Sequence, residues 1–425
     1  AVLDMLLVAW KGPETIPMPS MSLLLCAVPF VAAAAPKAGA ASVGAAVLDM
    51  VLQSPLYNAV LVPAARRTMV RTAEANGVPW VKSKQWIEQQ GPWSLNEAEA
   101  SVRVPEYYKA PFHSYEKGNL CWDAAWEVEI ASKAVGARNF PEHGSEGEEA
   151  FRSAFDSALD SLGACCADGG RILDLGCGSG VSTRRLARRF PRAAAVVGVD
   201  LSPHFLAVGR KLLELGSRAH GNGDEHADGE LSAAMHAEAS ALLRDELGAQ
   251  DAQLCGSRGS WVNPLECDGR VSFIRADAAD TGLPCESFDV ASLALVIHEL
   301  PPHATRDIVA EAFRVLRPGG QLWITEMDFS TQGFRKLRAN PLLFSLIRAT
   351  EPYLDQYADY QPQLPDDLLA TGFRDICLAA ATGRHFALVA TKPRDGREGR
   401  TEIDDRRLET AKEDTHLNTW EAARM

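Results

Sequence analysis

The sequence predicts an α/β protein: a doubly wound, mostly parallel sheet of seven strands that ends in an antiparallel C-terminal hairpin, preceded by a mainly helical N-terminal cap. Two observations support this prediction. From residue 151 onward, short apolar runs alternate with helical patterns, which is typical of βαβ units in a sheet covered on both faces. The last two apolar runs are only a few residues apart, too close for a crossover helix, and therefore form a hairpin.

Each strand follows from an apolar run, and each helix from apolar residues spaced three and four apart. The predicted strands are Arg171–Leu175, Ala194–Val199, Val271–Arg275, Phe288–Ile297, Gln321–Met327, Phe373–Ala379 and His385–Lys392. The helices predicted between the strands are Val181–Phe190, Pro203–Leu215 and Pro302–Leu316.

Shifts in composition divide the 425 residues into a leader, a cap, a main domain and a tail. The leader is apolar and alanine-rich, which suits a targeting segment or a disordered start; a chloroplast-type organelle and the cytoplasm both stay open as locations. An acidic insertion in the main domain is too long for a helix-to-strand connection, so we expect it to be solvated. The predicted boundaries are 1–45 for the leader, 46–150 for the cap, 151–395 for the main domain, 217–268 for the insertion within it and 396–425 for the charged tail.

The predicted cap is rich in aromatic residues. Five of the nine tryptophans lie between Trp80 and Trp126. Such side chains beside polar groups suit either a lid over a ligand or the core of a small helical domain. Within the cap, Arg66–Asn76 and Trp122–Ala134 have helical spacing, and 138–150 is expected to be a polar linker.

The composition argues against nucleic acid and metal as partners. Asp and Glu total 56 against 43 Lys and Arg, a net charge of -13, which repels phosphate backbones. The arginines between Arg184 and Arg192 are expected to form an exposed helix flank. Since the nine cysteines form no CxxC pair, no zinc site or disulfide framework is indicated. No apolar run reaches the roughly 20 residues that cross a bilayer, so no transmembrane span is expected.

The strongest local signal is a glycine-rich turn that directly follows a strand and precedes a helix, Asp174-Leu175-Gly176-Cys177-Gly178-Ser179-Gly180. Glycines at alternate positions let a ligand approach the backbone closely, and the helix presents free N–H groups at its start. The spacing is GxGxG rather than the GxGxxG of dinucleotide sites, and the Lys-Ser/Thr of a nucleotide-triphosphate loop is missing. The acid before the first glycine favours a cation over a phosphate.

Two further acids lie where later strands end. Asp200 closes the second strand, where a carboxylate can accept both hydroxyls of a ribose. Asp277 closes the third strand, where an adenine amino group would need an acceptor. A single acid at a strand end often only caps the next helix. Three acids at successive strand ends, beside a glycine turn, indicate one ligand site.

Together these motifs resemble those of the class I S-adenosylmethionine-dependent methyltransferases, in particular the type 11 and type 25 methyltransferase domains. Phe288–Leu300 resembles the family's fourth-strand motif, Glu311–Glu326 resembles its helix–turn–strand with LRPGG, and the terminal hairpin matches its antiparallel seventh strand. The resemblance covers roughly residues 151–392 and implies S-adenosylmethionine as cofactor and S-adenosylhomocysteine as product. Phe112–Trp122 is also similar to a segment of methyltransferases from photosynthetic organisms, which names no acceptor.

The resemblance also implies the cofactor contacts. Asp174 and Gly176 would face the methionine part, Asp200 the ribose and Asp277 the adenine. The implied contacts lie in the glycine turn and at the ends of the first four strands: Asp174, Gly176, Cys177, Gly178, Gly180, Asp200, Leu201, Asp277, Ala278 and Leu295. The thiol of Cys177 is expected to pack away from the cofactor.

A sulfonium methyl group is already activated, so alignment supplies much of the catalysis, about 7–11 kcal/mol. A general base is needed only for an acceptor that arrives protonated. His298, at the end of the fourth strand, is the candidate base, with Glu299 to orient it; the alternative is that His298 only caps the next helix. His113, Tyr115 and Trp122 are candidate substrate contacts, with packing inside the cap as the alternative.

The sequence therefore predicts a methyltransferase that acts on a small-molecule or lipid-like acceptor. The alternative is a catalytically silent binding or scaffold subunit that kept the fold. The acidic insertion is expected on the face opposite the cofactor, away from the substrate; a tolerated spacer is the default interpretation, and a docking site for a protein partner is the alternative. The sequence does not distinguish O-, N-, C- and S-methylation, since the fold hosts all of them.

Overall fold

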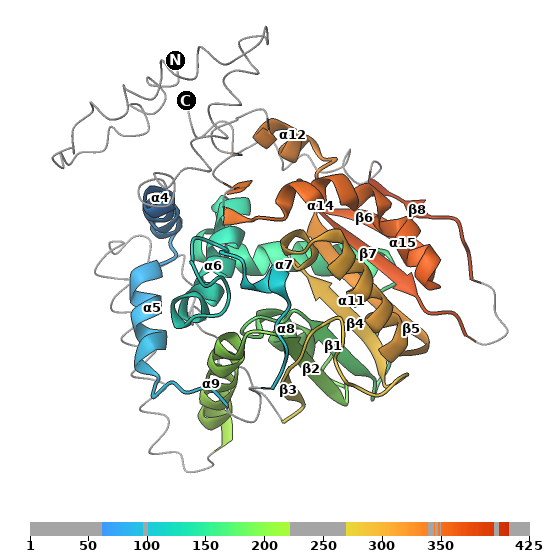
Figure 1. Cartoon of the computed structure of the whole chain (residues 1–425), viewed down its shortest axis with the longest axis horizontal. Coiled ribbons are helices and arrows are strands. Elements are labelled where there is room, and N and C mark those ends of the chain that lie inside the picture. The colour runs from blue at the N-terminus through green and yellow to red at the C-terminus, as the bar shows by residue number, and fades with distance from the viewer. Residues whose placement is uncertain are drawn as a thin grey trace, which may run out of the picture. The chain divides into compact units, whose positions relative to one another are not determined.

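One sheet of eight strands runs through the main domain in the order β3-β2-β1-β4-β5-β7-β6-β8 (Figure 1). Neighbouring strands pair in parallel except at β7, which is antiparallel to both β5 and β6. The strands are β1 (Arg171–Leu175), β2 (Ala195–Asp200), β3 (Val271–Arg275), β4 (Phe288–Ala294), β5 (Leu316–Met327), β6 (Arg374–Thr382), β7 (His385–Thr391) and β8 (Asp404–Asp405). The predicted α/β class, with its antiparallel C-terminal hairpin, is confirmed.

The computed structural model describes residues 62–96, 101–221, 269–338, 344, 347–348, 350–394 and 399–407. These described residues belong to one compact unit. The predicted leader, almost all of the insertion and most of the tail lie outside the described residues. The division into domains therefore stays a prediction.

The prediction of seven strands is wrong, because part of the charged tail adds an eighth. In β8, Asp404 and Asp405 pair in parallel with Cys377 and Leu378 of β6. Just beyond it, Arg407 bonds to Asp328, which is 1% exposed. Two consecutive acids have no apolar alternation, so the sequence pattern contains no sign of this strand.

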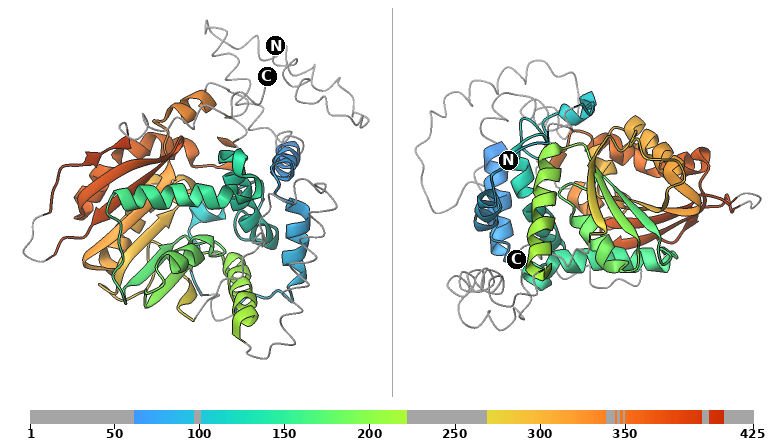
Figure 2. Two further views of the ribbon diagram at one scale, coloured as in Figure 1. Left: turned by 180° about the vertical axis from the view of Figure 1, so that it is seen from behind. Right: turned by 90° about the horizontal axis from the view of Figure 1, so that it is seen from below.

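Alternate side chains of the sheet enter two separate cores, as expected when helices cover both faces. Leu173 and Leu175 of β1 pack on one side, and Ile172 packs on the other. The first core includes α11 (Pro302–Val315), α14 (Leu354–Tyr360) and α15 (Leu364–Thr371). The second includes α7 (Gly147–Ser161) and α8 (Val181–Arg189). Figure 2 shows helices on both sides of the sheet, and the first core also holds Phe334 of the short α12 (Gln332–Arg338).

The first three described helices pack against α9 (Pro203–Gly221), beside the edge strand β3 and its neighbour β2 (Figure 1). They are α4 (Val62–Ala75), α5 (Trp80–Gln89) and α6 (Trp122–Asn139). Their shared core includes Trp80, Ile87 and Ile130, together with Phe205 and Leu212 of α9. The predicted helices at Arg66–Asn76 and Trp122–Ala134 are therefore present, the second with five more residues.

The polar linker predicted at 138–150 is wrong. This stretch contains the end of α6, the short 3-10 helix η4 (Pro141–Glu146) and the start of α7. A Cβ atom on Gly136 would lie 2.2 Å from the Cα of Glu148, and one on Gly147 would lie 2.5 Å from the Cα of Ala137. The two glycines thus let the backbones of α6 and α7 come into direct contact. The boundary predicted at residue 150 falls inside α7.

Only part of the predicted arginine flank is exposed: Arg188 and Arg192 are exposed, whereas Arg184, Arg185 and Arg189 are not. Arg185 bonds to Glu149 and Asp156 of α7, and Arg189 bonds to Asp156 and Asp160. The side chains of Arg185 and Arg189 are only 14% and 13% exposed. The prediction failed for these two arginines because the neutralising acids come from another helix.

We expect Gly136→Ala to lower the free energy of unfolding by about 1–3 kcal/mol, because the added methyl group overpacks the contact between α6 and α7. Urea denaturation would measure the change. Ser157→Ala, on the exposed face of α7, is the control and should leave stability nearly unchanged. Equal stabilities of the two variants would contradict the close helix contact.

Candidate cofactor and acceptor site

The glycine turn has the backbone that its sequence predicts. Gly176, Gly178 and Gly180 all have positive φ angles, of 72°, 57° and 88°. A Cβ atom on Gly180 would lie 2.3 Å from the ring of Phe273, and one on Gly176 would lie 2.8 Å from Val296. Glycine is therefore required at both positions by conformation and by space.

Asp174 is buried beneath this turn. Its Oδ2 accepts hydrogen bonds from the hydroxyls of Ser182 and Thr183, at 2.7 and 2.6 Å, while its Oδ1 is buried without a partner. Burial raises the pKa of this carboxyl to about 6, although the two hydroxyls act in the opposite direction. An orphaned carboxylate oxygen fits a cationic group such as the amino group of S-adenosylmethionine.

Asp200, at the end of β2, is 7% exposed and surrounded by donors. Its Oδ2 accepts from the backbone N–H of Gly178 at 2.9 Å. Its Oδ1 accepts from the N–H of Ser202 at 2.8 Å and from the hydroxyl of Tyr108 at 3.1 Å. Burial raises the pKa of Asp200, and the backbone donors offset part of that rise.

The third acid is less enclosed. Asp277 follows β3, and its Oδ1 accepts from the N–H of Ala279 at 2.9 Å. Burial raises its pKa as well. Two other predicted cofactor contacts lie next to these strand ends in the sequence. Ala278 is partly buried against the core, and Leu201 is buried with its carbonyl bonded to Arg275. Asp174 lies one residue before the end of β1, Asp200 ends β2, and Asp277 comes two residues after β3, so the three acids lie at the carboxyl ends of three adjacent strands.

Leu295 ends β4 with a φ of 58°, an unusual angle for a residue with a side chain. Its N–H donates to the carbonyl of Thr325 at 2.9 Å. The turn that it makes brings Val296 against Gly176, so β4 forms a wall beside the glycine turn.

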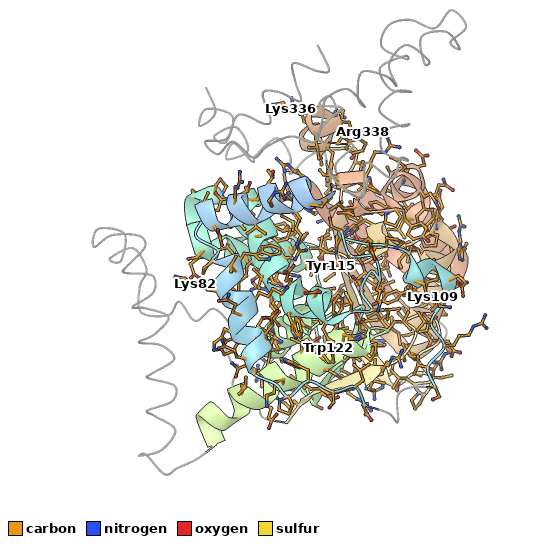
Figure 3. The ribbon with its side chains drawn as sticks, turned by 60° about the vertical axis from the view of Figure 1, so that its left-hand side comes forward. Lys82, Lys109, Tyr115, Trp122, Lys336 and Arg338 are labelled. Atoms are coloured by element: carbon orange, nitrogen blue, oxygen red, sulfur yellow. The ribbon has the colours of Figure 1, made fainter. Side chains whose placement is uncertain are left out.

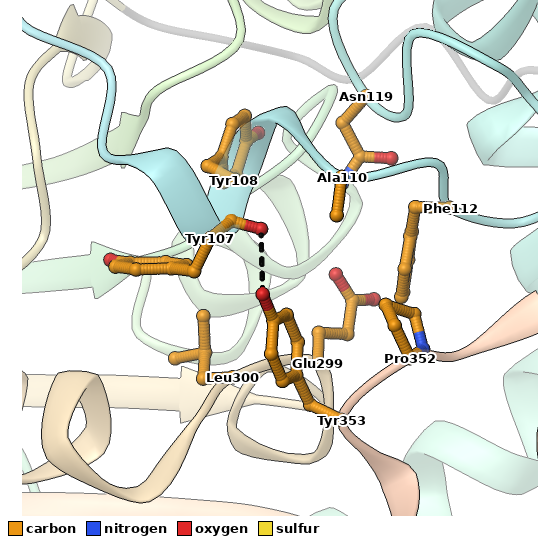
Figure 4. Close-up of a pocket in the computed structure, with 9 residues that line it drawn as sticks. All are labelled: Tyr107, Tyr108, Ala110, Phe112, Asn119, Glu299, Leu300, Pro352 and Tyr353. Atoms are coloured by element: carbon orange, nitrogen blue, oxygen red, sulfur yellow. Dashed lines mark hydrogen bonds between the residues drawn. The ribbon is translucent and has the colours of Figure 1, made fainter.

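A segment between α5 and α6, which we call the strap (residues 105–121), passes in front of these strand ends. It contains the 3-10 helix η3 (Glu106–Lys109). Together with groups from η6 (Ile297–Glu299) and from the loop before α14, it lines a cavity with about 310 Å³ of empty space that opens to solvent (Figure 4). The lining residues are Tyr107, Tyr108, Ala110, Phe112, Asn119, Glu299, Leu300, Pro352 and Tyr353.

Four of the nine lining residues are aromatic. The enclosed space is only about 30 Å³, far below the roughly 300–1,000 Å³ of small-molecule sites, so the cavity must widen before it can hold such a molecule. Glu299 is the acid among its lining residues, and the hydroxyl of Tyr353 donates to the carbonyl of Tyr107 at 3.3 Å across the opening (Figure 4).

Behind Glu299 lies a cluster of buried charges. The Nδ1 of His298 is 2.8 Å from Oε1 of Glu326, which is fully buried at the end of β5. The Nε2 of His298 is 3.9 Å from Glu351. Burial lowers the pKa of His298, but the charge and hydrogen bond of Glu326 outweigh it, with help from Glu351, and raise the pKa to about 10.

The pKa of Glu299 is raised as well, which for a carboxyl group favours the neutral form. Burial raises the pKa of its carboxyl to about 8; the charge of His298 lowers it, whereas those of Glu351 and Glu326 raise it. Burial also raises the pKa of Glu351. At neutral pH the imidazole of His298 is therefore protonated and paired with Glu326, while Glu299 is largely neutral. The expected pair of His298 with Glu299 is replaced by a pair of His298 with Glu326.

The structure separates the three predicted substrate contacts from the cavity. Tyr115 donates its hydroxyl to the buried Glu127, with the guanidinium of Arg66 over its ring. Trp122 packs against Trp93, Trp126 and His204. Figure 3 shows both labelled side chains on the strap side of the molecule, and neither lines the cavity.

His113 is closer, because its Nε2 lies 4.0 Å from Glu351, and its neighbour Phe112 lines the cavity. Tyr107, Tyr108 and Glu326 are the residues that the sequence reasoning missed. Glu326 had a signal, since it ends a predicted strand as Asp200 does. Nothing in the sequence other than the aromatic residues around them marked Tyr107 and Tyr108 as site residues.

A buried ion pair ties the cap to the glycine turn. Glu129 of α6 accepts a hydrogen bond from the hydroxyl of Ser179 at 3.1 Å and pairs with Arg184 of α8. Arg184 in turn donates to the carbonyl of Ser179 at 2.9 Å. Since Glu129 and Arg184 are 5% and 6% exposed, this pair connects the two parts in a region that water hardly reaches.

The fold and the site define a class I α/β methyltransferase domain. Two family models, each described as a methyltransferase domain, match residues 172–225 and 228–324. The chain thus carries a domain of the class I S-adenosylmethionine-dependent methyltransferase family. The buried acids and the glycine turn fit S-adenosylmethionine, the cofactor of this family.

The chain is 26% identical over 180 residues to the ubiquinone/menaquinone biosynthesis C-methyltransferase UbiE of Stutzerimonas stutzeri, which covers 42% of this chain. It spans about half, 50%, of that relative's length. Among solved structures it resembles phosphoethanolamine N-methyltransferase 2 of Haemonchus contortus (17% identity, TM-score 0.33, 62% and 60% of the two chains). An O-methyltransferase family protein of Burkholderia thailandensis is similar to the same degree (17%, TM-score 0.36, 62% and 63%). These low TM-scores support no argument about function.

Within the described residues, no helix is both long and apolar enough to cross a membrane. The same residues contain no group of three or more His, Cys, Asp or Glu side chains arranged to hold a metal ion.

We expect Glu129→Gln to lower the free energy of unfolding by about 3 kcal/mol, because it leaves the charge of Arg184 buried without its partner. Glu149→Gln is the matched control: its carboxylate, 54% exposed, pairs with Arg185 of α8, the helix that also carries Arg184, so its loss should cost less than about 1 kcal/mol. Denaturant titration of both variants compares the two. Equal losses would contradict the role of Glu129 as a buried link.

Proposed function

We propose that this protein transfers a methyl group from S-adenosylmethionine to a small-molecule or lipid-like acceptor. One observation carries the proposal: the glycine turn and the acids Asp174, Asp200 and Asp277 lie at the carboxyl ends of adjacent strands, and Asp174 keeps a buried oxygen without a partner. In this arrangement Asp174 would neutralise the amino group, Asp200 would accept the ribose hydroxyls, and Asp277 would lie beside the adenine. The bound cofactor supplies a sulfonium-activated methyl group.

We place the acceptor in the aromatic cavity under the strap. Its walls combine aromatic rings and aliphatic groups with the side chains of Asn119 and Glu299, a lining that suits an apolar or aromatic molecule with few polar atoms. Such walls exclude water and hold the acceptor in line with the methyl group, the main contribution that this reaction needs. The name of the relative UbiE makes C-methylation one reaction type to test.

We assign the role of general base to Glu299 rather than to His298. Both ring nitrogens of His298 face carboxylates, and its high pKa keeps it protonated, so it cannot accept a proton at neutral pH. Glu299 lines the cavity, and with a pKa of about 8 a minority of it is already the carboxylate at neutral pH, a fraction that grows as the pH rises. Glu299 as a carboxylate takes the proton that the acceptor loses during methyl transfer, and His298 positions the cluster.

We expect Asp200→Ala to abolish binding of S-adenosylhomocysteine. In the wild-type chain, ligand at 100 times its dissociation constant should add about 2.7 kcal/mol to stability, a gain that thermal melting detects. Asp160→Ala removes an exposed acid of α7 and should keep the full gain. A folded wild-type chain without any shift would contradict the proposal and favour the silent scaffold.

The titration of Glu299 gives a prediction that needs no acceptor. Its pKa is about 8 in the folded chain and 4.5 when solvated, so the folded state holds a proton that the unfolded state releases between these values. The free energy of unfolding therefore falls as the pH rises from about 4.5 to about 8. Glu299→Gln lacks this titration and should gain stability relative to wild type across that range.

Urea denaturation at several pH values measures this difference. Glu142→Gln, an exposed acid with a 59% accessible side chain, is the control and should follow the wild-type curve. If the curves of Glu299→Gln and wild type stay parallel, the carboxyl of Glu299 has an ordinary pKa and is not the base.

A further inference from the structure

Two hydrogen bonds hold the strap next to Asp200, the carboxylate that would bind the ribose. On one side, the hydroxyl of Tyr108 donates to Oδ1 of Asp200 at 3.1 Å. On the other, the hydroxyl of Ser202 donates to the carbonyl of Asn119 at 2.6 Å. Tyr108 and Asn119 also line the cavity, so the same segment covers Asp200 and encloses the acceptor space.

The number of hydrogen bonds that Asp200 can accept limits how a ribose can bind to it. A carboxylate offers about four lone-pair sites, two on each oxygen. In Asp200, Ser202 and Tyr108 occupy Oδ1, Gly178 occupies one site of Oδ2, and the backbone N–H of Leu201 is a further donor to the carboxylate. At most one site is left, but a ribose has two neighbouring hydroxyls to donate. The three backbone donors belong to the turns of the fold, which leaves the Tyr108 hydroxyl as the donor that can be exchanged.

We propose that Tyr108 is part of the cofactor site and competes with the ribose hydroxyls for Asp200, so that cofactor binding displaces the strap. This inference rests on the proposed function. Burial and the charge of Asp200 hold the pKa of Tyr108 well above its usual value, so its hydroxyl is a donor at every pH of interest. Because Tyr107 and Ala110 belong to the same segment, the displacement reshapes the acceptor cavity. Cofactor binding thus precedes and prepares acceptor binding.

Calorimetric titration of S-adenosylhomocysteine into the full chain tests the competition. Tyr108→Phe keeps the ring but removes the competing hydroxyl, and should tighten binding about three- to tenfold, the size of one hydrogen bond. Tyr360→Phe is the matched control, since it deletes a tyrosine hydroxyl bonded to Asp367 outside the site, and should not change affinity. Equal or weaker binding by Tyr108→Phe would overturn the inference.

A second measurement uses the wild-type chain and does not depend on the variant folding. Hydrogen exchange of the strap amides, including the N–H of Tyr108 bonded to the carbonyl of Pro105, should accelerate when S-adenosylhomocysteine is bound. Unchanged or slower exchange would show that the strap stays in place and would overturn the inference. No binding to wild-type protein would instead refute the proposed function, so the two failures are distinguishable.

Discussion

The burial of carboxylates at the carboxyl edge of the sheet is the constraint on which the rest of the site depends. Asp174, Asp200 and Glu326 end three different strands and are almost inaccessible to water. A buried carboxylate lowers stability unless donors surround it. Here the donors come from the glycine turn, from the start of α8 and from η6. The same bonds that stabilise the acids also set the conformation of the loops that face the ligand.

The cap belongs to this arrangement. Glu129 reaches the glycine turn through Ser179 and Arg184, and Tyr108 reaches Asp200 directly. The cap therefore shapes both halves of the site: its α6 supports the cofactor turn from behind, and its strap closes the front. A substitution in the cap should therefore change cofactor binding, although the motifs of the family all lie in the main domain.

The charge cluster at the end of β4 explains how one short sequence, His298-Glu299, gives two different groups. His298 lies between Glu326 and Glu351 and keeps its proton. Glu299 lines the cavity, and its burial, with the charges of Glu351 and Glu326, outweighs the charge of His298, so its neutral form is favoured. Environment rather than residue type thus decides which of the two neighbouring groups carries a charge, as expected when coupled groups share a buried space.

The sequence by itself determined the strands, the glycine turn and the three acids at the carboxyl ends of β1, β2 and β3, because apolar runs and turn residues are local signals. It also determined the methyltransferase class through those motifs. Only the tertiary structure decided which distant groups meet: His298 with Glu326, 28 residues away, and Tyr108 with Asp200, 92 residues away. Local periodicity reports which face of an element is buried, whereas partners depend on strand register and on how the cap docks. The eighth strand and the backbone contact of Gly136 with Glu148 have the same origin, since each is defined by a neighbour that lies elsewhere in the fold.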